Sequence, residues 1–80
     1  IIICPSVTYW ASCLQVFSLG GTVIFADIDP NTLNITAESI ERRINEVDKR
    51  VRDRIKAIVV VHYLGMPADM DSIMEVAKRY

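Results

Sequence analysis

Side chains that could bind a ligand gather where three apolar runs of this chain end. The chemistry on offer is an imidazole, several carboxylates and hydroxyls, and an aromatic ring. An imidazole can act as an acid, a base, a metal ligand or a hydrogen-bond donor, and an aromatic face can stack on a planar ring. The three segments are Pro5-Ser6-Val7-Thr8-Tyr9, Asp27-Ile28-Asp29 and His62-Tyr63-Leu64-Gly65.

His62 is the only histidine of the chain, and no glutamate or cysteine lies at metal-ligand spacing from it. A metal site is therefore not expected. The alternative to a functional role is a histidine whose ring is satisfied by nearby backbone groups. The chain has no glycine-rich nucleotide fingerprint or phosphate loop. No lysine follows a strand, so none is a credible Schiff-base nucleophile.

The other polar and aromatic candidates have competing structural explanations. Asp27 and Asp29 could chelate a cation or hold a ribose hydroxyl, but an Asp-x-Asp-Pro sequence is more often a turn. Trp10 fits a helical stripe, which favours core packing. Tyr9 falls off that stripe and is the better candidate for ring stacking.

The elements that position these residues alternate between strand and helix. Apolar runs predict strands at Ile1–Cys4, Thr22–Ala26 and Ile55–Val61. Pro5 closes the first strand because proline has no N–H to donate. Helical spacing of apolar residues predicts three buried stripes: Trp10, Cys13, Leu14 and Phe17; Ile40, Ile44 and Val47; and Met70, Ile73, Met74 and Ala77.

Capping residues mark the ends of these helices. Ser6 or Thr8 can cap the first helix, Thr36 the second and Asp69 the third. Gly20-Gly21 ends the first helix, since glycine adopts the left-handed conformation of a C-cap.

This alternation predicts an α/β fold of three βα units of a parallel sheet, joined by right-handed crossovers. Parallel strands bring all three exits to one edge, where such sheets bind ligands. The chain begins inside an apolar run and ends on a helix. A domain of this length buries only about 60% of its unfolded surface. Residues 1–80 are therefore expected to form a partial domain that is incomplete at both ends.

Composition excludes several classes of function. Nine basic and ten acidic residues leave a net charge of −1, without the footprint of a nucleic-acid or acidic-membrane partner. The basic run from Lys49 to Arg54 predicts a solvated helix end or loop, with a polyanion site as the alternative. No apolar run approaches the roughly 20 residues of a membrane span. Cys4 and Cys13 should pack as small hydrophobic side chains in a reduced, cytoplasmic compartment.

Motifs along nearly the whole chain share their order and spacing with one family. They are Pro5-Ser6-Val7-Thr8-Tyr9, Gly20 to Asp29, Asn34-Ile35, Lys56-Ala57-Ile58, Val61-His62 and Gly65 to Asp71. The chain resembles the PLP-dependent sugar-nucleotide aminotransferases of the DegT/DnrJ type. The chain departs mildly from the family pattern at two places. Gly21 stands where an alanine is common, and the segment from Val47 to Arg54 is slightly longer than usual.

The resemblance implies part of a fold-type-I PLP-dependent transferase large domain, in a homodimer. The first strand would lie between the other two, making a switch point flanked by Thr8-Tyr9 and His62-Tyr63. Tyr9 matches the aromatic residue that stacks on the pyridine ring of pyridoxal 5'-phosphate. Thr8 and His62 match cofactor neighbours, with His62 in a supporting role. The family's catalytic lysine and pyridine-nitrogen aspartate lie outside this chain, which alone should neither hold PLP covalently nor catalyse.

The implied activity of the intact protein transfers an amino group from an amino acid, such as glutamate, to a nucleotide-linked keto sugar. This activity would serve the biosynthesis of cell-surface polysaccharides or of natural-product sugars. One alternative is a PMP-dependent sugar dehydratase of the same family. Another is a non-enzymatic flavodoxin-like binding or regulatory module, which should fold alone.

Overall fold

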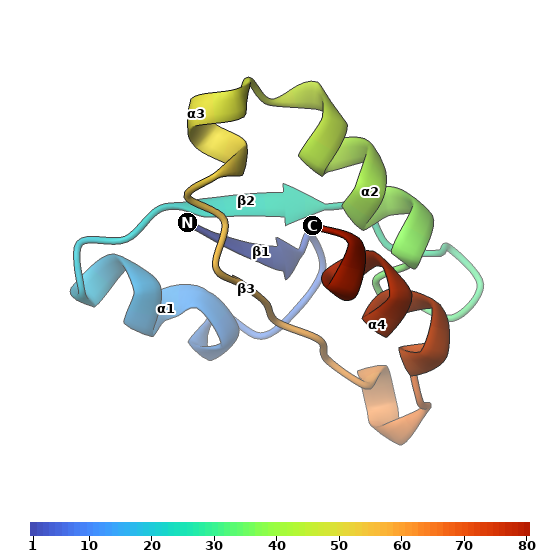
Figure 1. Cartoon of the computed structure of the whole chain (residues 1–80). Helices are drawn as coiled ribbons and strands as arrows, with labels where there is room; N and C mark the ends of the chain where they lie inside the picture. Colours follow the sequence, from blue (N-terminus) through green and yellow to red (C-terminus); the bar gives the residue numbers. More distant parts are fainter.

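The computed structural model describes residues 1–80 and contains one sheet of three parallel strands (Figure 1). The strands are β1 (Ile2–Pro5), β2 (Val23–Ala26) and β3 (Ala57–Ile58), and their order is β2-β1-β3. β1 pairs in parallel with both neighbours. The predicted α/β class is therefore confirmed, and so is the central place of the first strand.

Helices connect the strands and follow the last one. α1 (Ala11–Ser18) joins β1 to β2, while α2 (Ala37–Glu46) and α3 (Lys49–Arg52) join β2 to β3. The short 3-10 turn η1 (Tyr63–Gly65) and α4 (Met70–Arg79) complete the chain. The first crossover runs from β1 to its neighbour β2, and the second runs back in the opposite direction, past β1, to β3. Since both are right-handed, their helices lie on opposite faces of the sheet. Figure 1 shows α1 on one side of the strands, with α2 and α4 together on the other.

The main apolar core lies between the sheet and the pair α2 and α4. Successive side chains of a strand point to opposite faces, so Ile3 enters this core whereas Cys4 faces α1. The buried members are Ile3, Ala26, Ile35, Ile40, Ile44, Ala68, Ile73 and Val76.

β3 is much shorter than the predicted strand from Ile55 to Val61. Only Ala57 and Ile58 pair with β1, and the Val59 amide then donates to the Ile3 carbonyl over 2.8 Å. The backbone N–H and C=O groups of the odd-numbered residues of β1 point towards β3. The next N–H donor along this edge would therefore be the nitrogen of Pro5. That nitrogen carries no hydrogen, and the ladder ends there.

The expected core packing of Trp10 is wrong, because this residue is 59% exposed in the structure. Phe17 is also half-exposed, and Cys13 is the buried residue of α1. Ser6 and Thr8 do not cap α1, whose N-cap position is Trp10 without a side-chain hydrogen bond. The predicted end of the helix is confirmed, with Gly20 at a φ of 74°.

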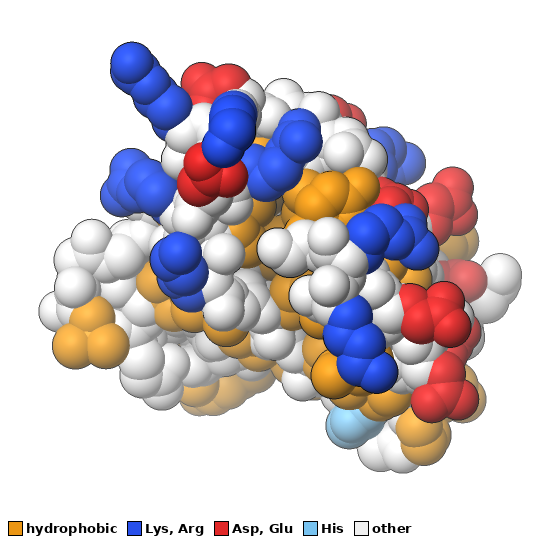
Figure 2. All heavy atoms as spheres, in the orientation of Figure 1, with side chains coloured by type: hydrophobic (Ala, Val, Ile, Leu, Met, Phe, Trp, Pro, Cys, Tyr) orange, Lys and Arg blue, Asp and Glu red, His pale blue; other side chains and the backbone are white.

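The predicted caps of the other two long helices are confirmed. Thr36 Oγ1 accepts a 3.2 Å hydrogen bond from the Ser39 amide, and Asp69 Oδ1 accepts one of 3.2 Å from the Ser72 amide. Between α2 and β3, the expected polar helix end is instead the separate helix α3, which Asp48 caps. Lys and Arg side chains gather over this part of the surface (Figure 2).

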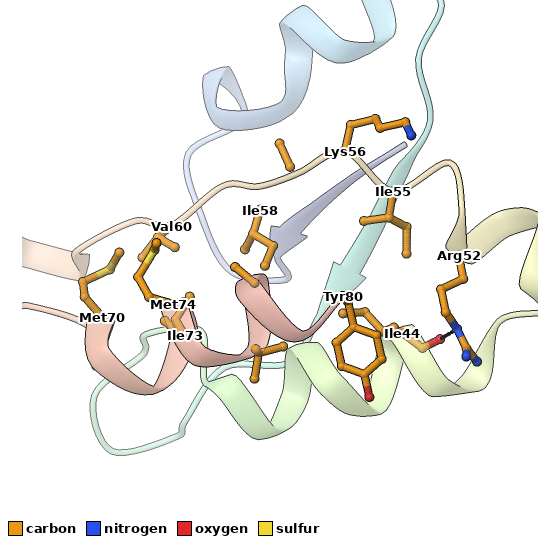
Figure 3. A pocket seen from close by; sticks show the side chains of 13 residues that line it. Ile44, Arg52, Ile55, Lys56, Ile58, Val60, Met70, Ile73, Met74 and Tyr80 are labelled. Carbon is orange, nitrogen blue, oxygen red and sulfur yellow. Dashed lines mark hydrogen bonds between the residues drawn. The ribbon is translucent and has the colours of Figure 1, made fainter.

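The predicted buried stripe of α4 is only partly correct. Its buried residues are Ile73 and Val76, because α4 packs against α2 and these two side chains join the core that contains Ile3. Met70, Met74 and Ala77 are exposed and, together with Ile73 and Val76, line an apolar groove of about 310 Å³ beside β3 (Figure 3).

Candidate functional site at the carboxyl edge of the sheet

The three strand exits share one edge of the sheet, as the parallel register requires (Figure 1). Pro5, the last residue of β1, lies opposite Ala26 at the end of β2, and Ile3 lies opposite Ile58 of β3. The chain leaves β1 towards α1 on one face and returns over the other face to β3. This edge is therefore a topological switch point, the usual ligand position in open α/β sheets.

Tyr9 offers an accessible aromatic surface at this edge. Tyr9 is 70% exposed, and its ring centroid lies 5.4 Å from that of Trp10, with the two planes tilted by 50°. Trp10 therefore supports one part of the tyrosine ring without covering it. The remaining ring surface can receive a planar ligand.

Thr8 ties the exit of β1 to the first turn of α1. Its Oγ1 lies 2.9 Å from the hydroxyl oxygen of Ser12, and the Ser12 amide donates to the Tyr9 carbonyl over 3.0 Å. Thr8 itself is half-buried. These contacts fix the backbone on which the Tyr9 ring stands.

His62 is exposed, and the backbone engages one of its ring nitrogens. The Ala68 amide donates to Nδ1 over 2.9 Å. A nitrogen that accepts a hydrogen bond carries no proton, so the proton of the neutral imidazole lies on Nε2. The structural alternative for His62, a ring that bonds to nearby backbone, is therefore met at Nδ1. The Nε2–H group has no partner in the chain and can still donate a hydrogen bond. No hydrogen bond joins His62 to Thr8 or Tyr9.

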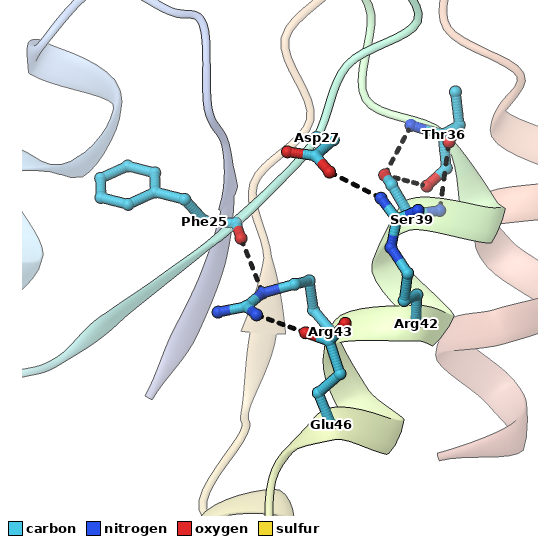
Figure 4. A network of polar contacts seen from close by, with 7 residues as sticks. All are labelled: Phe25, Asp27, Thr36, Ser39, Arg42, Arg43 and Glu46. Atoms are coloured by element: carbon cyan, nitrogen blue, oxygen red, sulfur yellow. Dashed lines mark hydrogen bonds and ion pairs between the residues drawn. The ribbon is translucent and has the colours of Figure 1, made fainter.

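Both aspartates after β2 have structural partners. Asp29 Oδ1 accepts hydrogen bonds from the amides of Asn31 at 2.6 Å and Thr32 at 3.3 Å, which confirms the predicted turn. Asp27 pairs with Arg42 at 2.6 Å on the exposed side of α2 (Figure 4). No group of three or more His, Cys, Asp and Glu side chains is placed to hold a metal ion.

Asn34 is a buried residue of this edge that belongs to a family motif but was not a predicted site residue. It is only 4% exposed. Its Nδ2 donates to the Met66 carbonyl over 3.0 Å, and its Oδ1 accepts from the Tyr63 amide over 2.8 Å. These partners lie 32 and 29 residues away along the chain. The Asn34-Ile35 motif marked the position, but no local pattern announces such distant contacts.

The cysteines pack as predicted, and the lysines lie away from the site. Cys4 and Cys13 are both buried and unpaired. Burial, reinforced by the neighbouring Cys13, raises the pKa of the Cys4 thiol, which keeps it protonated and weakly nucleophilic. Lys49 pairs with Asp53 at 2.6 Å, and this hydrogen bond lowers the pKa of Asp53. Lys56 donates to the Asp53 carbonyl.

The helices of the structure are short. None is both long and apolar enough to cross a membrane.

Comparisons with known proteins agree with the fold and with the motifs. The sequence matches the model of the DegT/DnrJ/EryC1/StrS aminotransferase family over residues 1–80. The fold is similar to the crystal structure of the sugar aminotransferase CalS13 from Micromonospora echinospora, with a TM-score of 0.80 and 26% sequence identity. The similarity covers 98% of this chain and 19% of the CalS13 chain, so this chain spans less than two thirds of that protein. The chain belongs to the DegT/DnrJ/EryC1/StrS aminotransferase family.

Proposed function

We propose that the protein carrying this chain is a PLP-dependent aminotransferase. It transfers an amino group from an amino acid, such as glutamate, to a nucleotide-linked keto sugar for polysaccharide or natural-product biosynthesis. The observation that carries this proposal is the family match over the whole chain. The exposed Tyr9 ring and the His62 donor at a switch-point edge support it.

We also propose that residues 1–80 form part of a larger cofactor-binding domain. The similarity to CalS13 supports this view, since it covers 19% of that chain. A homodimer and a cytoplasmic location belong to the same proposal. The two unpaired cysteines suit a reducing compartment.

The residues of the edge fit part of a pyridoxal phosphate site. The free face of Tyr9 suits a pyridine ring, and the Nε2–H of His62 and the Thr8 hydroxyl suit its polar substituents. The bound cofactor would supply an electron sink, while the protein orients it. The three lysines (Lys49, Lys56 and Lys78) lie away from this edge, so a Schiff-base lysine would come from outside these residues.

In this proposal each residue of the edge has a distinct task. Tyr9 sets the plane of the cofactor ring by stacking on it. Thr8 holds the backbone that carries Tyr9, through its contact with Ser12. His62 donates a hydrogen bond from Nε2 and transfers no proton in the reaction.

The first experiment identifies the reaction. The protein carrying this chain is purified, its absorbance is recorded with added PLP, and it is incubated with glutamate and nucleotide-linked keto sugars. Mass spectrometry should detect an amino sugar and 2-oxoglutarate. A dehydrated sugar without nitrogen would instead establish the PMP-dependent dehydratase. Absence of any PLP or PMP binding would contradict both enzymes and revive the flavodoxin-like module, which the family match does not support.

The second experiment tests the role of Tyr9. Tyr9→Ala removes the ring, and PLP should dissociate about threefold to tenfold more readily, as expected for loss of one aromatic pair. Tyr9→Phe keeps the ring and should bind PLP like the wild type. Phe17→Ala is the matched control, because it removes a half-exposed aromatic ring from the far end of α1. Equal PLP affinity of Tyr9→Ala and Phe17→Ala would rule out stacking on Tyr9.

A further inference from the structure

Asn34 is the buried polar side chain that links two of the three strand exits. It lies in the loop between β2 and α2. Both the nitrogen and the oxygen of its side-chain amide form hydrogen bonds with the segment that follows β3. A buried amide is costly unless both its donor and its acceptor are satisfied. Here the two hydrogen bonds satisfy both groups at once, so the side chain has a single favourable orientation.

The loop around Asn34 holds this side chain in place. The Asp29 amide donates to the Asn34 carbonyl over 2.9 Å, and the Asn34 amide donates to Thr32 Oγ1 over 3.2 Å. Leu33, directly before Asn34, has a φ of 61°. A leucine in the left-handed region persists only where surrounding contacts determine the conformation. The contacts within the loop therefore fix the backbone position of Asn34.

The turn that Asn34 binds has little stability of its own. Leu64 has a φ of 51° and is 92% exposed, so side-chain packing does little to offset its left-handed conformation. Gly65 follows with a φ of 79°. Asn34 binds Tyr63 and Met66, the residues on either side of this left-handed pair. It thereby closes the turn from both ends.

The same segment continues to the partner of His62. The His62 carbonyl accepts from the Gly65 amide over 3.0 Å. Two residues after Met66, the Ala68 amide donates to His62 Nδ1. A shift of the turn would move this amide away from the ring. The orientation and the tautomer of His62 therefore depend on the geometry that Asn34 maintains.

We infer that Asn34 is a positioning residue for His62: its buried amide closes the turn after β3 and so keeps the imidazole in its Nε2–H form at the carboxyl edge. The role of this donor towards PLP rests on the proposed function. The arrangement of Asn34, the turn and the His62 ring does not.

The test reads the imidazole directly. The protein carrying this chain is labelled with ¹⁵N-histidine, and the His62 signal is identified by its loss in His62→Gln. The wild-type protein should show one Nε2–H tautomer. Asn34→Asp keeps an acceptor for the Tyr63 amide but places a carboxylate oxygen against the Met66 carbonyl, and Asn34→Ala removes both contacts. Both variants should show averaged shifts of two tautomers.

Two further variants separate positioning from a general loss of stability. Thr36→Ala removes a helix cap two residues from Asn34 without touching the turn, so the His62 tautomer should not change. Gly65→Ala strains the turn without changing Asn34, because alanine disfavours the φ of 79° at this position. The added Cβ meets no atom within 4 Å, so it causes no clash. This variant should therefore reproduce the averaged His62 shifts of the Asn34 variants, even if Asn34→Ala does not fold.

PLP binding supplies the second readout. Asn34→Asp should weaken PLP binding by about threefold to tenfold, the effect of losing one hydrogen bond. In a His62→Ala background the same substitution should have no further effect, because the residue through which it acts is gone. A single unchanged His62 tautomer in Asn34→Asp and Gly65→Ala would overturn the inference. Failure of the wild type to bind PLP would overturn the proposed function and leave the tautomer result standing.

Discussion

α2 and α4 cover one face of the sheet with a closed apolar core, whereas α1 leaves much of the other face open. Ile3 and Ile40 are fully buried on the first face. On the second face Trp10, Phe17 and Phe25 keep 59%, 52% and 45% of their surface exposed. Since both faces belong to the same strands, the difference comes from the helices and not from the sheet. The α2 and α4 face supplies most of the burial that stabilises the fold.

The helix ends differ in the same way. The helices of the closed face begin with side-chain caps, and α2 has a reciprocal one in which Thr36 and Ser39 bond each other's backbone. α1 begins at Trp10 without such a cap. The closed face is also tied at its rim, where Arg43 donates to the Phe25 carbonyl at the outer edge of β2 (Figure 4). The open face carries Tyr9, the exposed ring of the proposed site.

The largest effect is expected from truncating one side chain on each face. Ile40→Ala creates a cavity in the closed core and should lower the free energy of unfolding by about 2–5 kcal/mol. Phe17→Ala removes a half-exposed ring and should cost about 1 kcal/mol or less. Denaturant unfolding of the protein carrying this chain, followed by circular dichroism, measures both. Equal losses of unfolding free energy in the two variants would contradict the contrast between the two faces. They would show that another segment or subunit covers α1.

A smaller difference is expected from the helix caps. Thr36→Ala removes the hydroxyl that accepts from the Ser39 amide and should cost about 1 kcal/mol. Ser6→Ala is the control near α1, because the Ser6 side chain caps no helix, and it should change nothing measurable. Hydrogen exchange should quicken in the first turn of α2 only. Similar losses in both variants would mean that Ser6 has a partner outside these residues.

The smallest effect concerns acid. Hydrogen bonds from the Ser72 hydroxyl and amide lower the pKa of Asp69, so folding favours its ionised form. The resulting stability is present above the unfolded pKa of about 3.9 and is lost as pH falls through the lower folded value. Asp69→Asn should therefore speed exchange of the α4 first-turn amides near neutral pH, and the difference should shrink below about pH 4.

The α1 amides serve as the internal reference for this titration. No titratable side chain caps α1, so its exchange should not follow the ionisation of Asp69. A difference between wild type and Asp69→Asn that persisted at the lowest pH would contradict the assignment of the effect to the carboxylate.

Much of the fold could be predicted because its causes are local. Thr36 and Asp69 precede helical patterns at capping positions, and Gly20 supplies a left-handed helix end. The exit residues Thr8, Tyr9 and His62 follow apolar runs, so parallel pairing was enough to place them at one edge. The early end of the β1-β3 ladder also has a local cause, the missing N–H of Pro5. The sequence prediction used this proline to end the first strand but did not shorten the third strand accordingly.

The sequence by itself determined the α/β class, two of the three helix caps, the common edge of the exits and the family. Periodicity and chemical identity of single residues carry that information. Ile40 and Ile44 of α2 are buried as predicted, but only the tertiary structure decided that Trp10 is exposed and that Val76 of α4 is buried. It also decided that Asn34 holds the turn beside His62. Burial and long-range hydrogen bonds depend on elements that meet only after the chain has folded, and local sequence patterns do not record them.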